Sequence, residues 1–403
     1  MNREAATTPI DRLPPSPHLL VTGGAGFIGS AFVREILARG DRTRITVLDK
    51  LTYAGNRGNL ASVEAAPAQA ARLRFVEGDI ADASVVGPLV AEADAVVNWA
   101  AESHVDRSIL DPEAFLRTGV IGVHVLLEAC RVEAARAAAG ERRGTDGAAR
   151  PAPRFLQVST DEVYGSVETV YSREGDALDP RSPYSAAKAA GELLARSYFV
   201  TFGLDVVITR GSNTYGPFQH PEKLIPLFIS NAMDDQPLPL YGDGLQRRDW
   251  LYVTDHAGAV EHALHHGATG EIYNVPGEAE LPNREVVAEL LARLGKPWSL
   301  VRSVADRPGH DRRYAMDGSK LRALGWRNAV SFEQGIGETV DWFRANEGWW
   351  RAIRSGEWDA YYARQYSARL AGGVAAGSPA GSPGGADTVA AAAQAHEPGP
   401  ELG

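Results

Sequence analysis

The run Thr22–Gly29, which reads TGGAGFIG, constrains the fold of this 403-residue chain more than any other stretch. It follows the apolar segment Leu19–Val21 and opens Phe27–Arg39, where apolar residues recur at helical spacing. Glycines three residues apart let the chain turn tightly from strand to helix, and the free N–H groups of the helix start can face a pyrophosphate. Asp49 ends the next predicted strand about 20 residues later, as a dinucleotide fingerprint requires. Because its carboxylate would repel a 2′-phosphate, we expect NAD rather than NADP.

Short apolar segments alternate with helix-length segments through the first half of the chain. The predicted strands are Leu19–Val21, Ile45–Leu48, Leu73–Val76, Ala95–Val97, Phe155–Val158 and Val206–Ile208. This alternation is typical of an α/β fold with a doubly wound parallel Rossmann sheet. After about Gly211, frequent prolines and loops indicate a smaller C-terminal lobe. We expect Leu251–Val253 and Ile272–Val275 to return to the large sheet, so that the two lobes are interleaved.

The predicted domain boundaries follow from these patterns and from composition. Residues 1–17 are expected to form a disordered arm, 18–210 the NAD-binding domain, and 211–365 the substrate-binding lobe, with segments near 250–275 returning to the first domain. Residues 366–403 are expected to form a disordered tail. From about Gly372 the tail is dominated by Ala, Gly, Ser and Pro, which cannot bury enough apolar surface to offset the ordering entropy.

Composition excludes several classes of function. The formal charge of −10 argues against nucleic acid or an anionic membrane as a partner. The single cysteine, Cys130, excludes an internal disulfide and a cysteine-based metal cluster, and no metal site is expected. The N-terminus has no apolar signal core and no stretch is long enough to span a bilayer, so a cytoplasmic protein is predicted.

The polar run Ser159–Gly165 follows a predicted strand of the large sheet. Ligands bind at the carboxyl ends of strands in such sheets, so this run is expected at the ligand site. It contains two adjacent acids, Asp161 and Glu162, which can address different atoms as acid and base. Helix capping is the structural alternative for this acid pair.

Tyr184 and Lys188 lie four residues apart on a helix that Ser182 and Pro183 begin. Their side chains therefore share one helix face. A lysine ammonium close to a phenol lowers the pKa of the phenol, which makes a base for a hydroxyl proton while a hydride leaves to nicotinamide. A solvated helix face is the alternative for the pair alone, but its position after a dinucleotide fold favours a catalytic role.

These motifs are similar to those of the extended short-chain dehydrogenase/reductase superfamily, and from about His18 to Trp349 the chain resembles the dTDP-glucose 4,6-dehydratases. The resemblance rests on the glycine run, Tyr-x-x-x-Lys and six further motifs. They are Asp49–Asn56, Ala101–Ser108, Thr160–Gly165, Pro221–Pro226, Arg248–Trp250 and Asp306–Tyr314. Gly211 and Thr214 depart from the family pattern, which usually has Cys and Asn there. Asn213 matches the substrate-contacting Asn of the family.

The resemblance implies a reaction cycle on a nucleotide sugar. Tyr184 would take the C4 hydroxyl proton while the C4 hydride passes to NAD, and Thr160 would polarise the forming ketone. Glu162 would remove the C5 proton that the ketone acidifies, and Asp161 would protonate the leaving C6 hydroxyl. The hydride would return to C6, giving a 4-keto-6-deoxy sugar nucleotide and water. The implied catalytic residues are Thr160, Asp161, Glu162, Tyr184 and Lys188.

The resemblance, together with the strand ends, also implies the residues that bind each ligand. The expected cofactor-binding residues are Gly23, Gly26, Phe27, Ile28, Gly29, Asp49, Lys50, Thr52, Asp79, Ile80, Ala100, Ala101, Ser103, Thr118, Ser159, Tyr184, Lys188 and Asn213. The expected substrate-binding residues are Ser103, His104, Thr160, Asp161, Glu162, Asn213, Lys223, Leu224, Pro239, Tyr241, Arg248, Asn283, Arg307 and His310. Arginine suits the diphosphate because it can bind bidentately.

Two apolar helices, about Pro112–Arg136 and Tyr184–Phe202, pair across a two-fold axis in relatives, so a homodimer is expected. Within the superfamily the alternatives are nucleotide-sugar 4-epimerases, UDP-glucuronate decarboxylases and other nucleotide-sugar dehydratases. Epimerases have no use for an acid pair after Thr160, and decarboxylases typically have Ser where Asp161 stands. A non-catalytic NAD-binding regulator is the alternative from another class, and the complete catalytic set argues against it.

Overall fold

The computed structural model describes residues 11–144, 147–306, 309–355 and 357–371. A seven-stranded sheet dominates it, with the order β10-β6-β5-β4-β1-β2-β3 and every neighbouring pair parallel. The strands are β1 (His18–Thr22), β2 (Arg44–Asp49), β3 (Leu73–Glu77), β4 (Ala95–Asn98), β5 (Arg154–Thr160), β6 (Val206–Gly211) and β10 (Ile272–Val275). This confirms the predicted doubly wound α/β fold.

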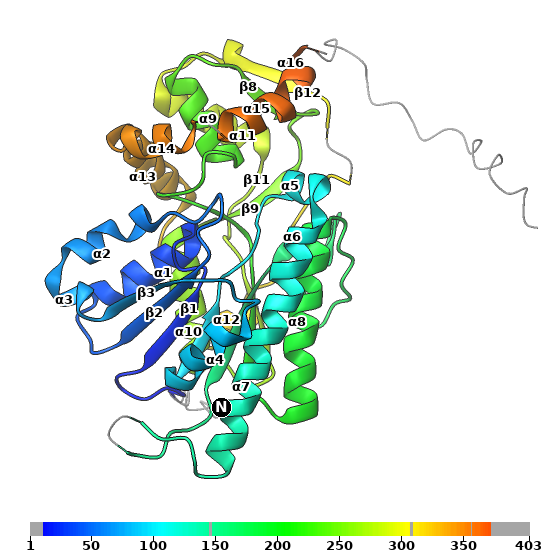
Figure 1. Cartoon of the computed structure of the whole chain (residues 1–403). Coiled ribbons are helices and arrows are strands. Elements are labelled where there is room, and N and C mark those ends of the chain that lie inside the picture. Colours follow the sequence, from blue (N-terminus) through cyan, green and yellow to red (C-terminus); the bar gives the residue numbers. More distant parts are fainter. Residues whose placement is uncertain (1–10, 145–146, 307–308, 356, 372–403) are drawn as a thin grey trace, which may run out of the picture.

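Helices cover both faces of this sheet (Figure 1). Successive side chains of a strand point to opposite faces, so a strand that is apolar throughout needs a covering layer on each side. Leu19 and Val21 of β1 pack in one core with α1 (Phe27–Ala38) and α10 (Val253–His266), while Leu20 packs in the other. The helices of that second core are α4 (Ala83–Glu92), α7 (Val123–Ala138) and α8 (Pro183–Phe202). Shorter elements between strands are η1 (Arg57–Leu60), α2 (Ala61–Ala65), α3 (Pro67–Ala70), α5 (Val105–Leu110), α6 (Pro112–Leu116), η2 (Arg117–Gly122) and η3 (Asp161–Tyr164).

The smaller lobe lies at one end of the large sheet (Figure 1). It contains a three-stranded sheet of β7 (Asn213–Tyr215), β9 (Arg247–Tyr252) and β11 (Glu280–Pro282), and a pair formed by β8 (Leu238–Tyr241) and β12 (Val301–Val304). The helical elements of the C-terminal half, besides α10, are α9 (Leu224–Met233), α11 (Asn283–Leu294), η4 (Trp298–Leu300), α12 (Ser319–Ala323), α13 (Phe332–Ala345), α14 (Glu347–Ile353), α15 (Glu357–Tyr362), η5 (Ala363–Ser367) and α16 (Ala368–Ala371). The lobe has its own apolar core, which includes Trp250 and Trp350.

One predicted strand joins a different sheet. Ile272–Val275 does return to the large sheet as β10, but Leu251 and Tyr252 belong to β9, which pairs with β7 and β11 in the lobe. Val253 already begins α10. The physical reason is that β10 occupies the place beside β6, so the large sheet offers no edge there to β9.

Both predicted chain ends need correction where the structure describes them. Residues 1–10 and 372–403 lie outside the described residues. Leu13, assigned to the loose arm, is 8% exposed and packs into the core beneath α1 and α10. The tail predicted from residue 366 begins too early, because η5 and α16 continue to Ala371 and Tyr366 is buried against Tyr241 and Tyr362. No helix within the described ranges is long and apolar enough to cross a membrane.

Candidate active site

The glycine run forms a turn that brings backbone against backbone. Gly23 has φ 67°, and a Cβ atom there would lie 2.7 Å from the amide nitrogen of Ala100. A Cβ atom at Gly29 would collide with the carbonyl oxygen of Gly23. Only glycine fits both positions, so the start of α1 packs directly on the end of β1 with its N–H groups free to face a ligand.

Asp49 ends β2 beside this turn. Its carboxylate accepts hydrogen bonds from the backbone N–H groups of Ala25 (2.9 Å) and Leu51 (2.8 Å). It is 8% exposed, and burial raises its pKa even though both hydrogen bonds oppose the shift. The acid therefore lies where a dinucleotide-binding turn needs an acceptor for a ribose hydroxyl.

A single cavity collects every residue predicted to bind the cofactor. It runs along the carboxyl ends of the parallel strands, from the glycine turn at β1 to the end of β6. Its lining includes Gly23, Gly26, Phe27, Ile28, Gly29, Asp49, Lys50, Thr52, Asp79, Ile80, Ala100, Ala101, Ser103, Thr118, Ser159, Tyr184, Lys188 and Asn213. The predicted catalytic residues Thr160, Asp161 and Glu162 line it too.

The acid pair lies at the end of β5, where the strand passes into η3. Thr160 is the N-cap of this short helix, and its hydroxyl oxygen accepts from the Glu162 N–H and donates to Asp161 Oδ1 at 3.1 Å. Asp161 is 3% exposed, and its Oδ2 has no hydrogen-bond partner among the described residues. Burial and then the charge of Glu162 raise the pKa of Asp161 well above its usual value. Asp161 is therefore a buried acid on the cavity wall whose raised pKa favours the protonated form, beside a second carboxyl group.

Tyr184 and Lys188 come from the first two turns of α8. The helix begins with a capping box in which the Ser182 and Ser185 side chains bond each other's backbone N–H groups at 3.1 Å, with Pro183 in the first turn. This start fixes the rotation of the helix, and Tyr184 and Lys188 then face the end of β5.

The pKa of Tyr184 differs from our expectation. Burial and then the charge of Glu162 raise it, while a hydrogen bond with Thr160 lowers it slightly. Lys188 does not produce the predicted lowering, because its amine donates to the Val158 carbonyl at 3.0 Å. Burial lowers the pKa of Lys188 to about 8. Positive charge brought close to the phenol would reverse the shift of Tyr184.

A second cavity adjoins the first and enters the smaller lobe. It shares Glu162, Asn213, Lys223, Leu224 and Trp250 with the cofactor cavity. Most of the predicted substrate residues line it, namely His104, Glu162, Asn213, Lys223, Leu224, Pro239, Tyr241, Arg248, Asn283 and His310. Ser103, Thr160 and Asp161 line the first cavity instead. Arg307 lies outside the described residues.

Arg248 and Lys223 bring the positive charge of this second cavity. Arg248 is 4% exposed, and its guanidinium lies 4.3 Å from the Tyr314 ring centroid and donates to the Asp311 carbonyl at 2.9 Å. Lys223 donates to the Ser103 carbonyl at 2.5 Å. Together they give the lining of this cavity two cationic side chains that suit an anionic ligand.

The sequence did not single out several residues that the structure brings to these cavities. Glu222 binds Arg107 at 2.8 Å. Burial raises its pKa, but interactions with Arg107, Lys223 and two histidines outweigh this effect and lower it to about 2. Tyr366, from the segment taken as a tail, lines the second cavity and stacks on Tyr241 at 6.2 Å between ring centroids. His256 lines the cofactor cavity. Only the position of Glu222 within the motif Pro221–Pro226 gave a signal in the sequence.

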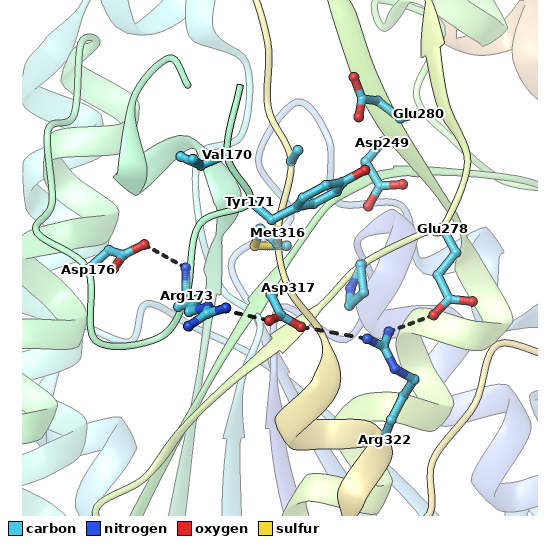
Figure 2. Close-up of a pocket in the computed structure, with 12 residues that line it drawn as sticks. Val170, Tyr171, Arg173, Asp176, Asp249, Glu278, Glu280, Met316, Asp317 and Arg322 are labelled. Carbon is cyan, nitrogen blue, oxygen red and sulfur yellow. Dashed lines mark hydrogen bonds and ion pairs between the residues drawn. The ribbon is translucent and has the colours of Figure 1, made fainter. Parts of the chain in front are cut away.

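Another cavity, of about 860 Å³, is lined by Tyr171, Asp249 and Arg322 among others (Figure 2). It contains none of the predicted site residues. Four of its charged side chains are paired with one another, since Arg322 binds Glu278 (2.7 Å) and Asp317 (3.6 Å), and Arg173 reaches Asp317 at 3.5 Å. We assign it no part in the reaction.

Comparison with known proteins identifies the family. A family model described as GDP-mannose 4,6 dehydratase matches residues 20–339. A dTDP-glucose 4,6-dehydratase of Streptomyces niveus is 49% identical over 344 residues, which covers 84% of this chain and 96% of the relative. This chain belongs to the dTDP-glucose 4,6-dehydratase family. A second member, from Xanthomonas campestris pv. campestris, is 50% identical over 84% of this chain and 96% of its own length.

The fold is that of the dehydratase family as well. The crystal structure of DesIV, a dTDP-glucose 4,6-dehydratase from Streptomyces venezuelae with NAD bound, superposes with a TM-score of 0.76 at 50% identity. The match covers 83% of this chain and 99% of that chain. The family is one of NAD-dependent hydro-lyases, as the resemblance implied.

Proposed function

We propose that this chain converts dTDP-glucose to dTDP-4-keto-6-deoxyglucose and water, using tightly bound NAD. The observation that carries the proposal is the buried Asp161, whose pKa is raised, next to Glu162, which lines both cavities. Elimination of water needs one group to donate a proton and another to remove one, and this pair provides both within one site.

The cavity suits NAD on several grounds. The glycine turn leaves room for a pyrophosphate against the start of α1, and Asp49 supplies a ribose acceptor. The Ser159 hydroxyl and the Asn213 side-chain oxygen are buried cavity atoms without a hydrogen-bond partner in the described part of the chain. When bound, NAD supplies a hydride acceptor that can give the hydride back.

The side chains divide the proton transfers among them. Tyr184 takes the proton of the C4 hydroxyl, and the Thr160 hydroxyl donates to the forming ketone oxygen. Glu162 removes the C5 proton, which the ketone has made acidic. Asp161 gives its proton to the leaving C6 hydroxyl, and water departs. Glu162 then returns its proton to C5 while the hydride taken from C4 returns to C6. Before the next turnover, the proton that Tyr184 gained passes to Asp161, directly or through solvent, so that no net acid or base is consumed.

The acid pair favours this reaction over the alternatives in the superfamily. A 4-epimerase needs only the tyrosine, the lysine and the cofactor, so a buried protonated acid would serve no purpose there. A regulator that uses NAD structurally would have no need to bury Asp161 at a cost to folding. The nucleobase is the part of the proposal that most needs a test. The matching family model is described as GDP-mannose 4,6 dehydratase, whereas the similar relatives are named dTDP-glucose 4,6-dehydratases.

The direct test incubates the purified chain with a panel of dTDP-, UDP- and GDP-hexoses, and mass spectrometry then follows the loss of one water. We expect dTDP-glucose to lose water and the other nucleotides to react far more slowly. If every hexose came back at its original mass, the proposal would be refuted. If only a GDP-hexose lost water, the proposed substrate would be wrong, while the proposed dehydration reaction would stand.

We also propose that the chain forms a homodimer through the outer face of α7 and α8, which pack side by side (Figure 1). The apolar side chains exposed there and on the adjoining α5, α6 and η2 are Ile109, Leu110, Leu116, Ile121, Val132, Leu193, Val200 and Phe202. Exposed apolar side chains gathered on neighbouring helices are typical of a protein–protein interface. Sedimentation should give twice the chain mass of 43.2 kDa, and Val200→Glu should halve it. A monomeric wild-type protein would rule out the dimer.

A further inference from the structure

His256 lies at the reacting end of the cofactor cavity, and the dehydration chemistry proposed above assigns it no role. It belongs to the first turn of α10, is 3% exposed and lines the cavity together with Lys188 and Trp99. The Trp99 ring packs edge-on against the imidazole at 5.2 Å between centroids. The side chain is therefore held in place and faces the space that the cofactor residues enclose.

The two departures from the family pattern both contact this histidine. Gly211 lies at the end of β6, and a Cβ atom there would come within 2.5 Å of Cε1 and 2.6 Å of Nε2 of His256. The absence of a side chain at Gly211 thus makes the room that the imidazole occupies. Thr214 holds the other side of the ring, with its hydroxyl oxygen 2.7 Å from Nδ1. The two residues that depart from the family pattern, Gly211 and Thr214, therefore both contact the imidazole of His256.

The hydrogen bonds of Thr214 bear on which ring nitrogen of His256 carries the proton. The Thr214 hydroxyl oxygen lies 3.1 Å from the Ser212 carbonyl and 2.7 Å from Nδ1 of His256. We assign its only hydrogen to the Ser212 carbonyl, an acceptor that cannot donate, so that the hydroxyl accepts from Nδ1–H of His256. Nε2 then carries the lone pair. Burial, and then the charge of Lys188, lower the pKa of His256 to about 3, so the ring is neutral. Nε2 is a buried acceptor with no hydrogen-bond partner among the described residues.

We propose that Nε2 of His256 accepts a hydrogen bond from the carboxamide N–H of the nicotinamide, and that Gly211 and Thr214 position the ring for it. The inference rests on the proposed use of NAD. The catalytic residues Tyr184 and Lys188 line the same end of the cavity, so this is where the nicotinamide reacts. An N–H donor from the cofactor satisfies an acceptor that burial otherwise leaves unpaired. His256 is thus a positioning residue that fixes the rotation of the nicotinamide.

A cofactor analogue separates this hydrogen bond from the rest of NAD binding. In 3-acetylpyridine adenine dinucleotide a methyl group replaces the carboxamide amine, so the donor is lost while the carbonyl stays. The full-length protein is equilibrated with an excess of an equimolar mixture of the two dinucleotides. After free nucleotide is removed, the bound molecules are released and their ratio is measured by chromatography, without any turnover.

We expect the preference of the wild-type protein for NAD to fall roughly fivefold in His256→Leu, the factor typical of one net hydrogen bond between neutral groups. His256→Gln, whose side-chain oxygen can accept, should restore most of it. The matched control is His262→Leu on the same helix, whose Nε2 bonds the Leu324 carbonyl away from the cavity and whose loss should leave the ratio unchanged.

An unchanged ratio in His256→Leu overturns the proposal, as does an equal loss of both dinucleotides. If that variant does not fold, Thr214→Val gives the same test. Without the hydroxyl acceptor, the proton can move to Nε2, which then repels the carboxamide N–H and lowers the preference for NAD. If the wild-type protein bound neither dinucleotide, the use of NAD itself would be refuted.

Discussion

Replacing Asp161 with asparagine tests the acid that the whole reaction needs. The amide has the same shape, and its oxygen can still accept the 3.1 Å hydrogen bond from the Thr160 hydroxyl, so the local structure should be kept. What is lost is the proton that the carboxyl group gives to the leaving hydroxyl. Removal of one general acid lowers kcat by about 10²- to 10⁴-fold, which corresponds to roughly 3–5 kcal/mol of transition-state stabilisation.

The same change has a signature in stability. The pKa of Asp161 is raised in the folded protein above the ordinary value of 3.8, so its native carboxyl group holds a proton that the unfolded chain releases. Its contribution to stability is therefore lost as the pH rises above that ordinary value toward the folded pKa. The asparagine side chain has no such proton, so we expect the Tm of Asp161→Asn minus that of the wild type to increase as the pH rises above about 4.

The assay combines mass spectrometry of the product with absorbance of reduced nicotinamide and thermal melts across pH. We expect Asp161→Asn to oxidise C4 and to accumulate reduced cofactor while dehydration stalls. Asp179→Asn is the matched control, since its side chain is 69% exposed and lines none of the cavities described above. Dehydration at the wild-type rate, or a Tm difference that falls as pH rises, would refute the assignment of Asp161 as the acid.

Three other changes test separate parts of the site. Tyr184→Phe should lower kcat by about 10²- to 10⁴-fold with substrate binding largely kept, and undiminished turnover would show that Tyr184 is not the base. Tyr366→Ala removes the ring stacked on Tyr241 and should raise KM roughly threefold to tenfold with kcat retained; an unchanged KM would exclude the C-terminal segment from the substrate site. Gly29→Val, whose side chain meets the Gly23 carbonyl, should abolish NAD retention and lower the Tm, and normal cofactor content would contradict the backbone packing argument.

Local patterns predicted most of the large sheet and the cofactor cavity. The glycine run and Asp49 are signals of this kind, because neighbouring residues in the sequence determine both where a tight turn can form and where a strand ends. The Tyr184–Lys188 pair could likewise be placed on one face of a helix, since a capping box and a proline mark its start. Each of these features depends on sequence separations of a few residues.

The failures came from contacts between distant segments. The sequence around Leu251 is compatible with a strand of either sheet. Its partner is decided by the fold, in which β10 and not β9 pairs with β6. The raised pKa of Tyr184 follows from burial and from Glu162, which no spacing on its own helix reveals. Tyr366 lies near a low-complexity tail but lines the second cavity, and His256 lines the cofactor cavity because the fold brings the start of α10 close to Gly211 at the end of β6.

The most direct test of the reaction follows the hydrogen at C4 of the sugar. The purified protein is incubated with dTDP-glucose that carries deuterium at C4, and the product is examined by NMR and mass spectrometry. Reversible transfer through one bound cofactor predicts that the deuterium appears in the C6 methyl group, with no net release of reduced nicotinamide. Deuterium lost to solvent, or reduced nicotinamide released in proportion to product, would contradict the proposed cycle.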